Sequence, residues 1–180
     1  MPQSEELKLA FPLSTIRVRN GLIVRPLVKS DLAELIAILA GDPEMSWSRS
    51  SWSRANVEYL LSHRLRHYDT HGFGPYAVIL DGHLIGMAGA QVWEEGSEAV
   101  ELLAYIAKSH WGRGLATELL GWSVMRLEHF TKQAHVFATT RPENARARSM
   151  VRRLGFQPMG KKSAHFGHEA ITWRRKLRNG

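Results

Sequence analysis

The fold of this chain is decided by the stretch Trp111-Gly112-Arg113-Gly114-Leu115-Ala116-Thr117. An apolar segment over residues 100–107 precedes it and is typical of a buried strand, and a helical pattern over residues 115–130 follows it. Two glycines at a strand-to-helix turn let backbone N–H groups approach a ligand, because no Cβ stands in the way. The helix start adds unpaired N–H donors and the positive end of the helix dipole. We therefore expect this turn to bind a phosphorylated ligand.

The composition indicates one globular domain. A chain of 180 residues, 44% hydrophobic and 23% charged, can bury a single core. The absence of cysteine excludes disulfides, thiolate metal sites and a cysteine nucleophile. No apolar run approaches the roughly 18 residues that a membrane span needs, and the acidic start over residues 1–6 is unlike a secretory signal. We expect a cytoplasmic protein without membrane contact.

The chain is basic, with 24 Lys and Arg residues against 17 Asp and Glu, a net charge of +7. Much of the excess lies between Arg141 and Arg178. Such a surface suits an anionic cofactor, a nucleic acid or the ribosome, but a solvated basic face explains the charge equally well. No zinc-finger spacing or RNA-binding aromatic signature accompanies it.

Turn and cap signals divide the rest of the chain into elements. Asn20-Gly21 and Asp81-Gly82 lie between apolar runs and predict two β-hairpins. Ser30 is expected to cap a helix that begins at Asp31, and the segment over residues 45–53 is expected to be a loop. The full set of predicted elements is strands over residues 16–19, 22–25, 76–80, 83–93, 99–107, 134–139, 156–159 and 169–176, and helices that begin at Asp31, after Ser53, at Leu115 and at Asn144.

This order predicts an α/β (α+β) fold with a mixed, mostly antiparallel sheet and helices on both faces. The domain is expected over residues 15–180, after a flexible N-terminal arm over residues 1–14. The predicted second helix carries an apolar stripe of Val57, Leu60, Leu61 and Leu65 in which Arg64 also falls.

Two better-known phosphate loops do not fit the glycine turn. A Walker A loop requires Gly-Lys-Ser/Thr after four spacer residues, and the chain lacks it. A dinucleotide fingerprint requires a third glycine three residues after Gly114, where Thr117 stands instead. A purely structural turn, with glycines only for tightness, stays open at this point.

The chain resembles the GNAT family of N-acetyltransferases over nearly its whole length. In the family signature Arg/Gln-x-x-Gly-x-Gly/Ala, Trp111 takes the first position, Gly114 the central glycine and Ala116 the last small residue. Tryptophan at the first position is usual for the branch that includes the ribosomal-protein N-terminal acetyltransferases. Three further features carry the resemblance: Arg25-Pro26-Leu27 with Asp31, Glu101 ten residues before Trp111, and Asn144 eleven residues before Gly155-Phe156.

The resemblance implies acetyl-CoA as the donor. The backbone amides over residues 112–117 would hold the pyrophosphate, with charge added by Arg113, and the strand near Ile106 would bond the pantetheine arm. The side-chain amide of Asn144 would contact the same arm, and a helix cap is a compatible role for it. The implied cofactor-binding residues are Ile106, Trp111, Gly112, Arg113, Gly114, Leu115, Ala116, Thr117 and Asn144.

Acetyl transfer to an amine requires a base, and Glu101 is the candidate. A glutamate in an otherwise apolar strand is costly to bury unpaired, so an ion pair with Arg25 is the alternative role. Glu98 is a second, weaker candidate. Thr139 stands where some family members have a glutamate, and Ala147, with Ser149 nearby, stands where many have a serine. The same strand carries Tyr105, which is either a proton donor or a core side chain, and water is the other source of that proton.

Several histidines and tryptophans are candidates for other sites. His63 and His67 share a helix face, but no zinc-protease pattern surrounds them, and we interpret them as surface histidines. His165 and His168 could line an acceptor cleft. The segment with Trp47 and Trp52 forms either an acceptor wall or a cover for the core.

The sequence therefore predicts an N-acetyltransferase whose acceptor is a protein N-terminal amine, in the manner of the ribosomal-protein enzymes, with ribosome contact through the basic surface. A small amine or antibiotic is the alternative acceptor. A non-catalytic module that binds CoA or RNA is the alternative of another class. A monomer and a homodimer are both compatible with the sequence.

Overall fold

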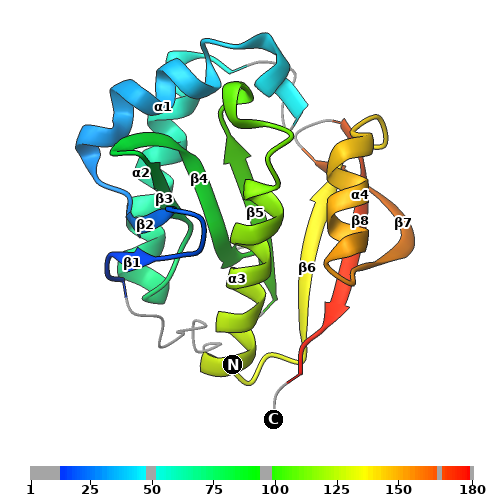
Figure 1. Cartoon of the computed structure of the whole chain (residues 1–180). Coiled ribbons are helices and arrows are strands. Elements are labelled where there is room, and N and C mark those ends of the chain that lie inside the picture. The colour runs from blue at the N-terminus through cyan, green and yellow to red at the C-terminus, as the bar shows by residue number, and fades with distance from the viewer. Residues whose placement is uncertain (1–12, 48–51, 94–98, 166–167, 179–180) are drawn as a thin grey trace, which may run out of the picture.

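A computed structural model describes residues 13–47, 52–93, 99–165 and 168–178. These residues form one eight-stranded sheet in the order β1-β2-β3-β4-β5-β6-β8-β7 (Figure 1). The strands are β1 Ile16–Arg17, β2 Ile23–Pro26, β3 Tyr76–Leu80, β4 His83–Val92, β5 Val100–Ile106, β6 His135–Thr140, β7 Gln157–His165 and β8 His168–Lys176. The helices are α1 Leu32–Leu39, α2 Arg54–His71, α3 Leu115–Phe130 and α4 Ala145–Arg153, with short 3-10 turns η1 Lys29–Asp31, η2 Pro43–Trp47 and η3 Lys108–His110.

Every neighbouring pair of strands is antiparallel except β5 and β6, which are parallel. This confirms the predicted mixed, mostly antiparallel sheet. The two hairpin turns are also confirmed, since Asn20, Gly21, Asp81 and Gly82 all have positive φ angles between 50° and 82°. Paired positive φ angles match the right-handed twist of the strands that such turns join.

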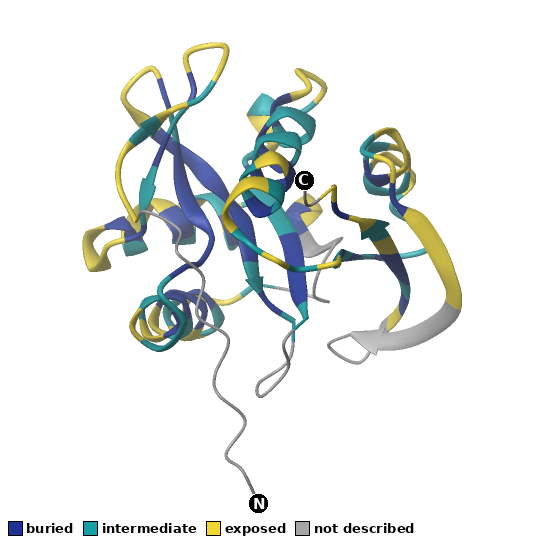
Figure 2. Cartoon of the chain, turned by 90° about the horizontal axis from the view of Figure 1, so that it is seen from below, coloured by how far each residue is buried: buried dark blue, intermediate teal, exposed yellow. Residues whose placement is uncertain are grey.

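Helices cover both faces of the sheet (Figure 1). On one face, α1 and α2 bury Leu35 and Leu61 against side chains of β3 and β4 such as Met87. On the other face, α3 and α4 bury Leu120 and Val151 against β5 and β6. Figure 2 shows the central strands mainly dark blue and the outer faces of the helices yellow. Among the described residues, no helix combines the length and the apolar character needed to cross a membrane.

The predicted start of α1 is wrong in its capping residue. The turn η1 precedes α1, and no side chain caps α1 itself. The buried carboxylate of Asp31 instead accepts the N–H of Val28, the residue before η1, at 2.8 Å. The guanidinium of Arg25 donates to the same carboxylate at 2.7 and 2.9 Å, so the charge is paired. The segment after α1 also differs from the expected loop, since η2 covers residues 43–47 and residues 48–51 lie outside the described part.

The other predicted caps are confirmed. The Ser53 side chain accepts the N–H of Asn56 at 3.2 Å at the start of α2. Asn144 Oδ1 accepts the N–H of Ala147 at 3.0 Å at the start of α4. Gly155, with φ 83°, follows α4 in the left-handed conformation that favours glycine. The arm predicted over residues 1–14 stays a prediction, because residues 1–12 lie outside the described part.

The parallel strands β5 and β6 pair over a short distance only. Their register joins Val100 to Val136, Glu101 to Phe137 and Leu102 to Ala138. Beyond Leu102, β5 continues to Ile106 without a partner on this side, and Figure 1 shows the two strands separating toward the top of the view. The sheet therefore opens in its middle.

His67 fastens α2 to the adjacent part of the chain. Its ring is buried, with 6% of the residue surface exposed, so the predicted surface position is wrong. Nδ1 bonds the Phe73 carbonyl at 2.7 Å and Nε2 accepts the N–H of Val92 at 3.0 Å, which fixes the neutral ring with its proton on Nδ1. Burial lowers the pKa of His67 from 6.5 to about 4. Among the described residues, no group of three potential metal ligands gathers here or elsewhere.

We predict that the free energy of unfolding falls as the pH is lowered from about 6.5 to about 4. In that interval the unfolded chain takes up a proton at His67 and the folded chain does not, so acid favours unfolding. Urea denaturation across this range should show the decrease in the wild type and a smaller one in His67→Gln. The control His83→Gln, at the exposed turn between β3 and β4, should behave as the wild type. An identical pH dependence in all three proteins would contradict the role of His67.

Candidate functional site

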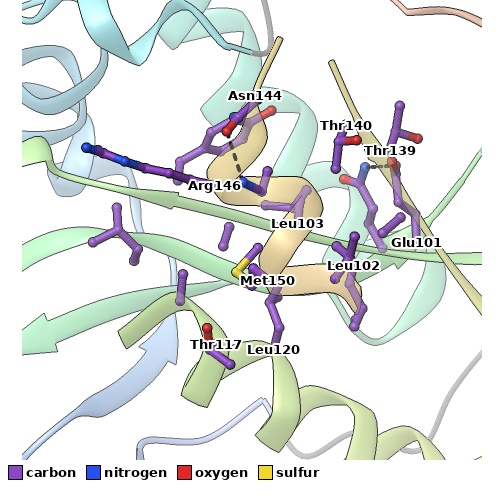
Figure 3. A pocket seen from close by; sticks show the side chains of 18 of the residues that line it. Glu101, Leu102, Leu103, Thr117, Leu120, Thr139, Thr140, Asn144, Arg146 and Met150 are labelled. Carbon is purple, nitrogen blue, oxygen red and sulfur yellow. Dashed lines mark hydrogen bonds between the residues drawn. The ribbon is translucent and has the colours of Figure 1, made fainter. Parts of the chain in front are cut away.

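A cavity of about 1740 Å³ occupies the opening between β5 and β6. It is lined by side chains from α2, β5, the start of α3, the end of β6 and α4 (Figure 3). Nine of the ten site residues named from the sequence line it: Glu101, Ile106, Trp111, Gly112, Gly114, Leu115, Ala116, Thr117 and Asn144. The tenth, Arg113, is exposed and lies outside the lining.

The backbone of β5 supplies hydrogen-bonding groups to this cavity. The N–H of Ala107 donates to the Ile85 carbonyl in β4 at 2.8 Å, and hydrogen bonding alternates along an antiparallel pair. Odd-numbered residues of β5 therefore bond to β4, and even-numbered residues direct their N–H and C=O groups toward β6. Because the pairing with β6 ends at Leu102, the N–H and C=O of Ala104 and the N–H of Ile106 face the opening.

The glycine turn lies at one end of the cavity. Gly112 and Gly114 have φ angles of 77° and 76°, and no atom lies within 4 Å of the place where a Cβ would stand on either. The space beside the backbone is thus open to a ligand. Helix α3 begins at Leu115, so the N–H groups of its first turn have no carbonyl partner within the helix. These features fit a bound phosphate.

Trp111 holds the turn in place. Its indole Nε1–H donates to the Ile106 carbonyl at 2.6 Å, which ties the turn to the end of β5. The guanidinium of Arg146, on the first turn of α4, lies 5.4 Å from the centre of the Trp111 ring. This cation–π contact joins α4 to the first residue of the glycine turn, and Arg146 brings a positive charge to the cavity wall.

Asn144 serves α4 as its cap through Oδ1 and lines the cavity. Its amide nitrogen carries two N–H donors, which the cap does not use. The two roles considered from the sequence, helix cap and ligand contact, are therefore compatible in geometry. Figure 3 shows Asn144 and Arg146 from α4 on the same cavity as Thr117 from α3.

Glu101 is buried in the cavity wall, with 5% of its surface exposed. Its Oε2 accepts a hydrogen bond from the side chain of Gln91, its neighbour on β4, at 2.9 Å. The alternative ion pair with Arg25 is wrong, because Arg25 pairs with Asp31. Glu98 lies outside the described residues.

Other candidates lie beside it. Thr139, Ala147 and Ser149 also line the cavity. Trp52 and Tyr105 line it too, and their rings meet edge to face with centroids 5.6 Å apart. Trp52 also donates its indole N–H to the Met45 carbonyl at 3.0 Å, so it closes the core and borders the cavity at once. The side chains of Trp47, His165 and His168 lie outside the described residues.

Three residues of the site were not predicted from the sequence. Ala104 acts through its backbone, which no sequence pattern marks. Arg146 depends on the approach of α4 to the glycine turn. Arg64 lines the cavity from α2, and its sequence signal was a guanidinium within an apolar helical stripe.

A comparison with protein families gives a match over residues 21–157 to the model described as acetyltransferase (GNAT) domain. The match covers most of the chain, including β5, the glycine turn and α4.

Solved structures of acetyltransferases share the fold. A GNAT-family acetyltransferase from Bordetella pertussis is 20% identical, with a TM-score of 0.76 over 90% of this chain and 99% of that one. An acetyltransferase from Salmonella typhimurium, which modifies the N-terminal serine of ribosomal protein L7/L12, is 14% identical, with a TM-score of 0.76 over 92% and 100%. The aminoglycoside acetyltransferase AAC(6′)-Ib, solved with coenzyme A, is 24% identical, with a TM-score of 0.70 over 86% and 94%. At these identities the likeness concerns the fold.

We predict that Asn144→Ala lowers the free energy of unfolding by about 1 kcal/mol, because α4 loses the bond to its Ala147 N–H. Asn144→Asp keeps an oxygen at the same place and should retain the wild-type stability. Urea denaturation of the three proteins measures the difference. Equal loss in both variants would show that the cap does not stabilise α4.

Proposed function

The chain belongs to the acetyltransferase (GNAT) family, and we propose that it transfers the acetyl group of acetyl-CoA to a protein N-terminal amine by direct attack of that amine. The observation that carries this proposal is a single cavity that joins an open glycine turn to a buried carboxylate through an unpaired strand edge. The turn suits the phosphates of the donor, the edge suits its amide-containing arm, and the carboxylate suits the amine.

The donor half of the site rests on backbone groups. The N–H groups over residues 112–117 would bind the pyrophosphate, and Arg146, which lines the same cavity, would add positive charge. The C=O of Ala104 and the N–H of Ile106 would bond to the pantetheine arm, which would take the place of β6 beside this part of β5. The Asn144 amide would donate to a carbonyl of the same arm. Arg113, exposed at the rim, would contribute only its charge.

The reaction requires a neutral amine and a polarised thioester carbonyl held within reach of each other. Glu101 would remove the proton of the incoming amine, directly or through one water. The N–H of Ala104 would donate to the thioester carbonyl oxygen, where negative charge develops. The leaving thiolate would take a proton from Tyr105, which lines the same cavity, or from a water.

The proposed acceptor draws support from two observations. The similar structures include an enzyme that modifies an N-terminal serine of a ribosomal protein. The end of α4 and the last strand expose basic side chains that suit a ribosomal surface: Arg152, Arg153, Arg174, Lys176 and Arg178. An aminoglycoside, the acceptor of another similar structure, is the alternative.

Gly114→Glu should abolish acetyl-CoA binding in calorimetry, because it places a carboxylate where the phosphates would lie. Gly82→Glu is a matched control: both glycines have positive φ and open space beside them, but Gly82 lies in the turn between β3 and β4. The control should bind acetyl-CoA as the wild type does. Unchanged binding by Gly114→Glu would exclude the glycine turn as the phosphate site.

Glu101→Gln should lower kcat by about 100-fold or more and leave the affinity for acetyl-CoA unchanged, since it removes the base and keeps the side-chain shape. Release of the CoA thiol, measured against a panel of amines and N-terminal peptides, reports the rate. Glu58→Gln removes an exposed carboxylate from α2 and should keep wild-type turnover.

Full activity of Glu101→Gln would exclude it as the base. No thiol release by the wild type with any amine would instead favour a non-catalytic binding module, whose RNA affinity would fall steeply with salt.

A further inference from the structure

Arg64 is the most deeply buried cation on the cavity wall. It lies on the face of α2 that packs toward β5, and 8% of its surface is exposed. Its Nε has no hydrogen-bond partner among the described residues, and the contact of its Nη1 with His63 Nδ1 is long, at 3.5 Å. A guanidinium has five N–H donors and no acceptor, so most of its capacity is unused.

Burial of such a charge is unfavourable unless something pairs with it. Burial lowers the pKa of the Arg64 guanidinium, while the negative charge of Glu101 and the Tyr105 side chain act in the opposite direction. Glu101 does not bond to it: among the described residues, Glu101 Oε2 accepts from Gln91, and the long contact of Arg64 is with His63. Arg64 therefore lines the same cavity as the proposed base with hydrogen-bond donors that no described residue satisfies.

The part of the wall that α2 forms is also positively charged. It contributes Arg64 and Arg66 and no carboxylate. Both carboxylates of this helix, Glu58 and Asp69, lie outside the lining. A polycationic acceptor would meet like charge on this wall, and an anionic group would meet its opposite.

We propose that Arg64 binds a carboxylate of the acceptor, so that the preferred amine carries an acidic group close to it. This inference rests on the proposed acetyl transfer and adds the chemical class of its acceptor. Two sources supply such a carboxylate: an aspartate or glutamate side chain near a peptide N-terminus, or the α-carboxylate of a free amino acid. The planar fork of Arg64 would bind either one with two parallel hydrogen bonds.

Calorimetry on the CoA-bound protein tests the proposal with matched probes. One pair is two hexapeptides that begin with serine and differ by aspartate or asparagine at the second position. The other pair is free serine and serinamide. We expect the carboxylate member of one pair to bind at least about tenfold more tightly, which is the effect of a charge-assisted bond. The pair that shows the difference identifies the source.

Variants of Arg64 test whether the difference in affinity within a pair of probes depends on this side chain. Arg64→Gln and Arg64→Met should bind both members of the pair alike while retaining wild-type affinity for CoA, which reports an intact fold. Arg54→Gln removes an exposed arginine of the same helix outside the cavity and should keep the difference.

Three results would overturn the proposal: equal affinity for the members of both pairs in the wild type, no measurable binding of any probe, or a difference that persists in Arg64→Gln. If Arg64→Gln lowered kcat equally for the aspartate and the asparagine peptide, Arg64 would instead be a positioning residue for Glu101. Failure of acetyl transfer itself appears separately, as absence of thiol release while the binding difference remains.

Discussion

The incomplete pairing of β5 with β6 is the constraint on which the rest of the structure depends. Two parallel strands that stayed together would bond every backbone group between them and leave no opening. Here the pairing ends after three residue pairs, and the N–H and C=O of Ala104 and the N–H of Ile106 remain available. An unpaired buried edge is unfavourable without a partner. A ligand with amide groups can supply that partner, which makes the opening a binding site.

The turn after β5 follows from the same constraint. The chain leaves β5 at the opening, passes through η3 and enters α3 at Leu115, and Gly112 and Gly114 have positive φ angles in this short connection. Trp111 fixes this geometry through its bond to Ile106, and Arg146 braces it from α4. These contacts thus hold the start of α3, the proposed phosphate site, in a fixed position relative to the edge of β5.

The sequence predicted most elements of the fold because their signals are local. Hairpins at Asn20-Gly21 and Asp81-Gly82 and the caps Ser53 and Asn144 act within a few residues, so the chain alone determines them. The errors concern side chains with competing partners. Ser30 fits the pattern of a cap, but it lies inside the turn η1, which the Asp31 carboxylate stabilises through the Val28 N–H and Arg25.

By itself, the sequence determined the element order, the glycine turn and the family resemblance, since each is written in spacing along the chain. It also marked Glu101 as a polar residue in a buried strand. Only the tertiary structure decided the partners: Gln91 for Glu101, two backbone groups for His67, and Trp111 for Arg146. It also left Arg64 buried with unused donors. These contacts join segments that are distant in sequence. Their distances in space are fixed only when the helices pack on the opened sheet.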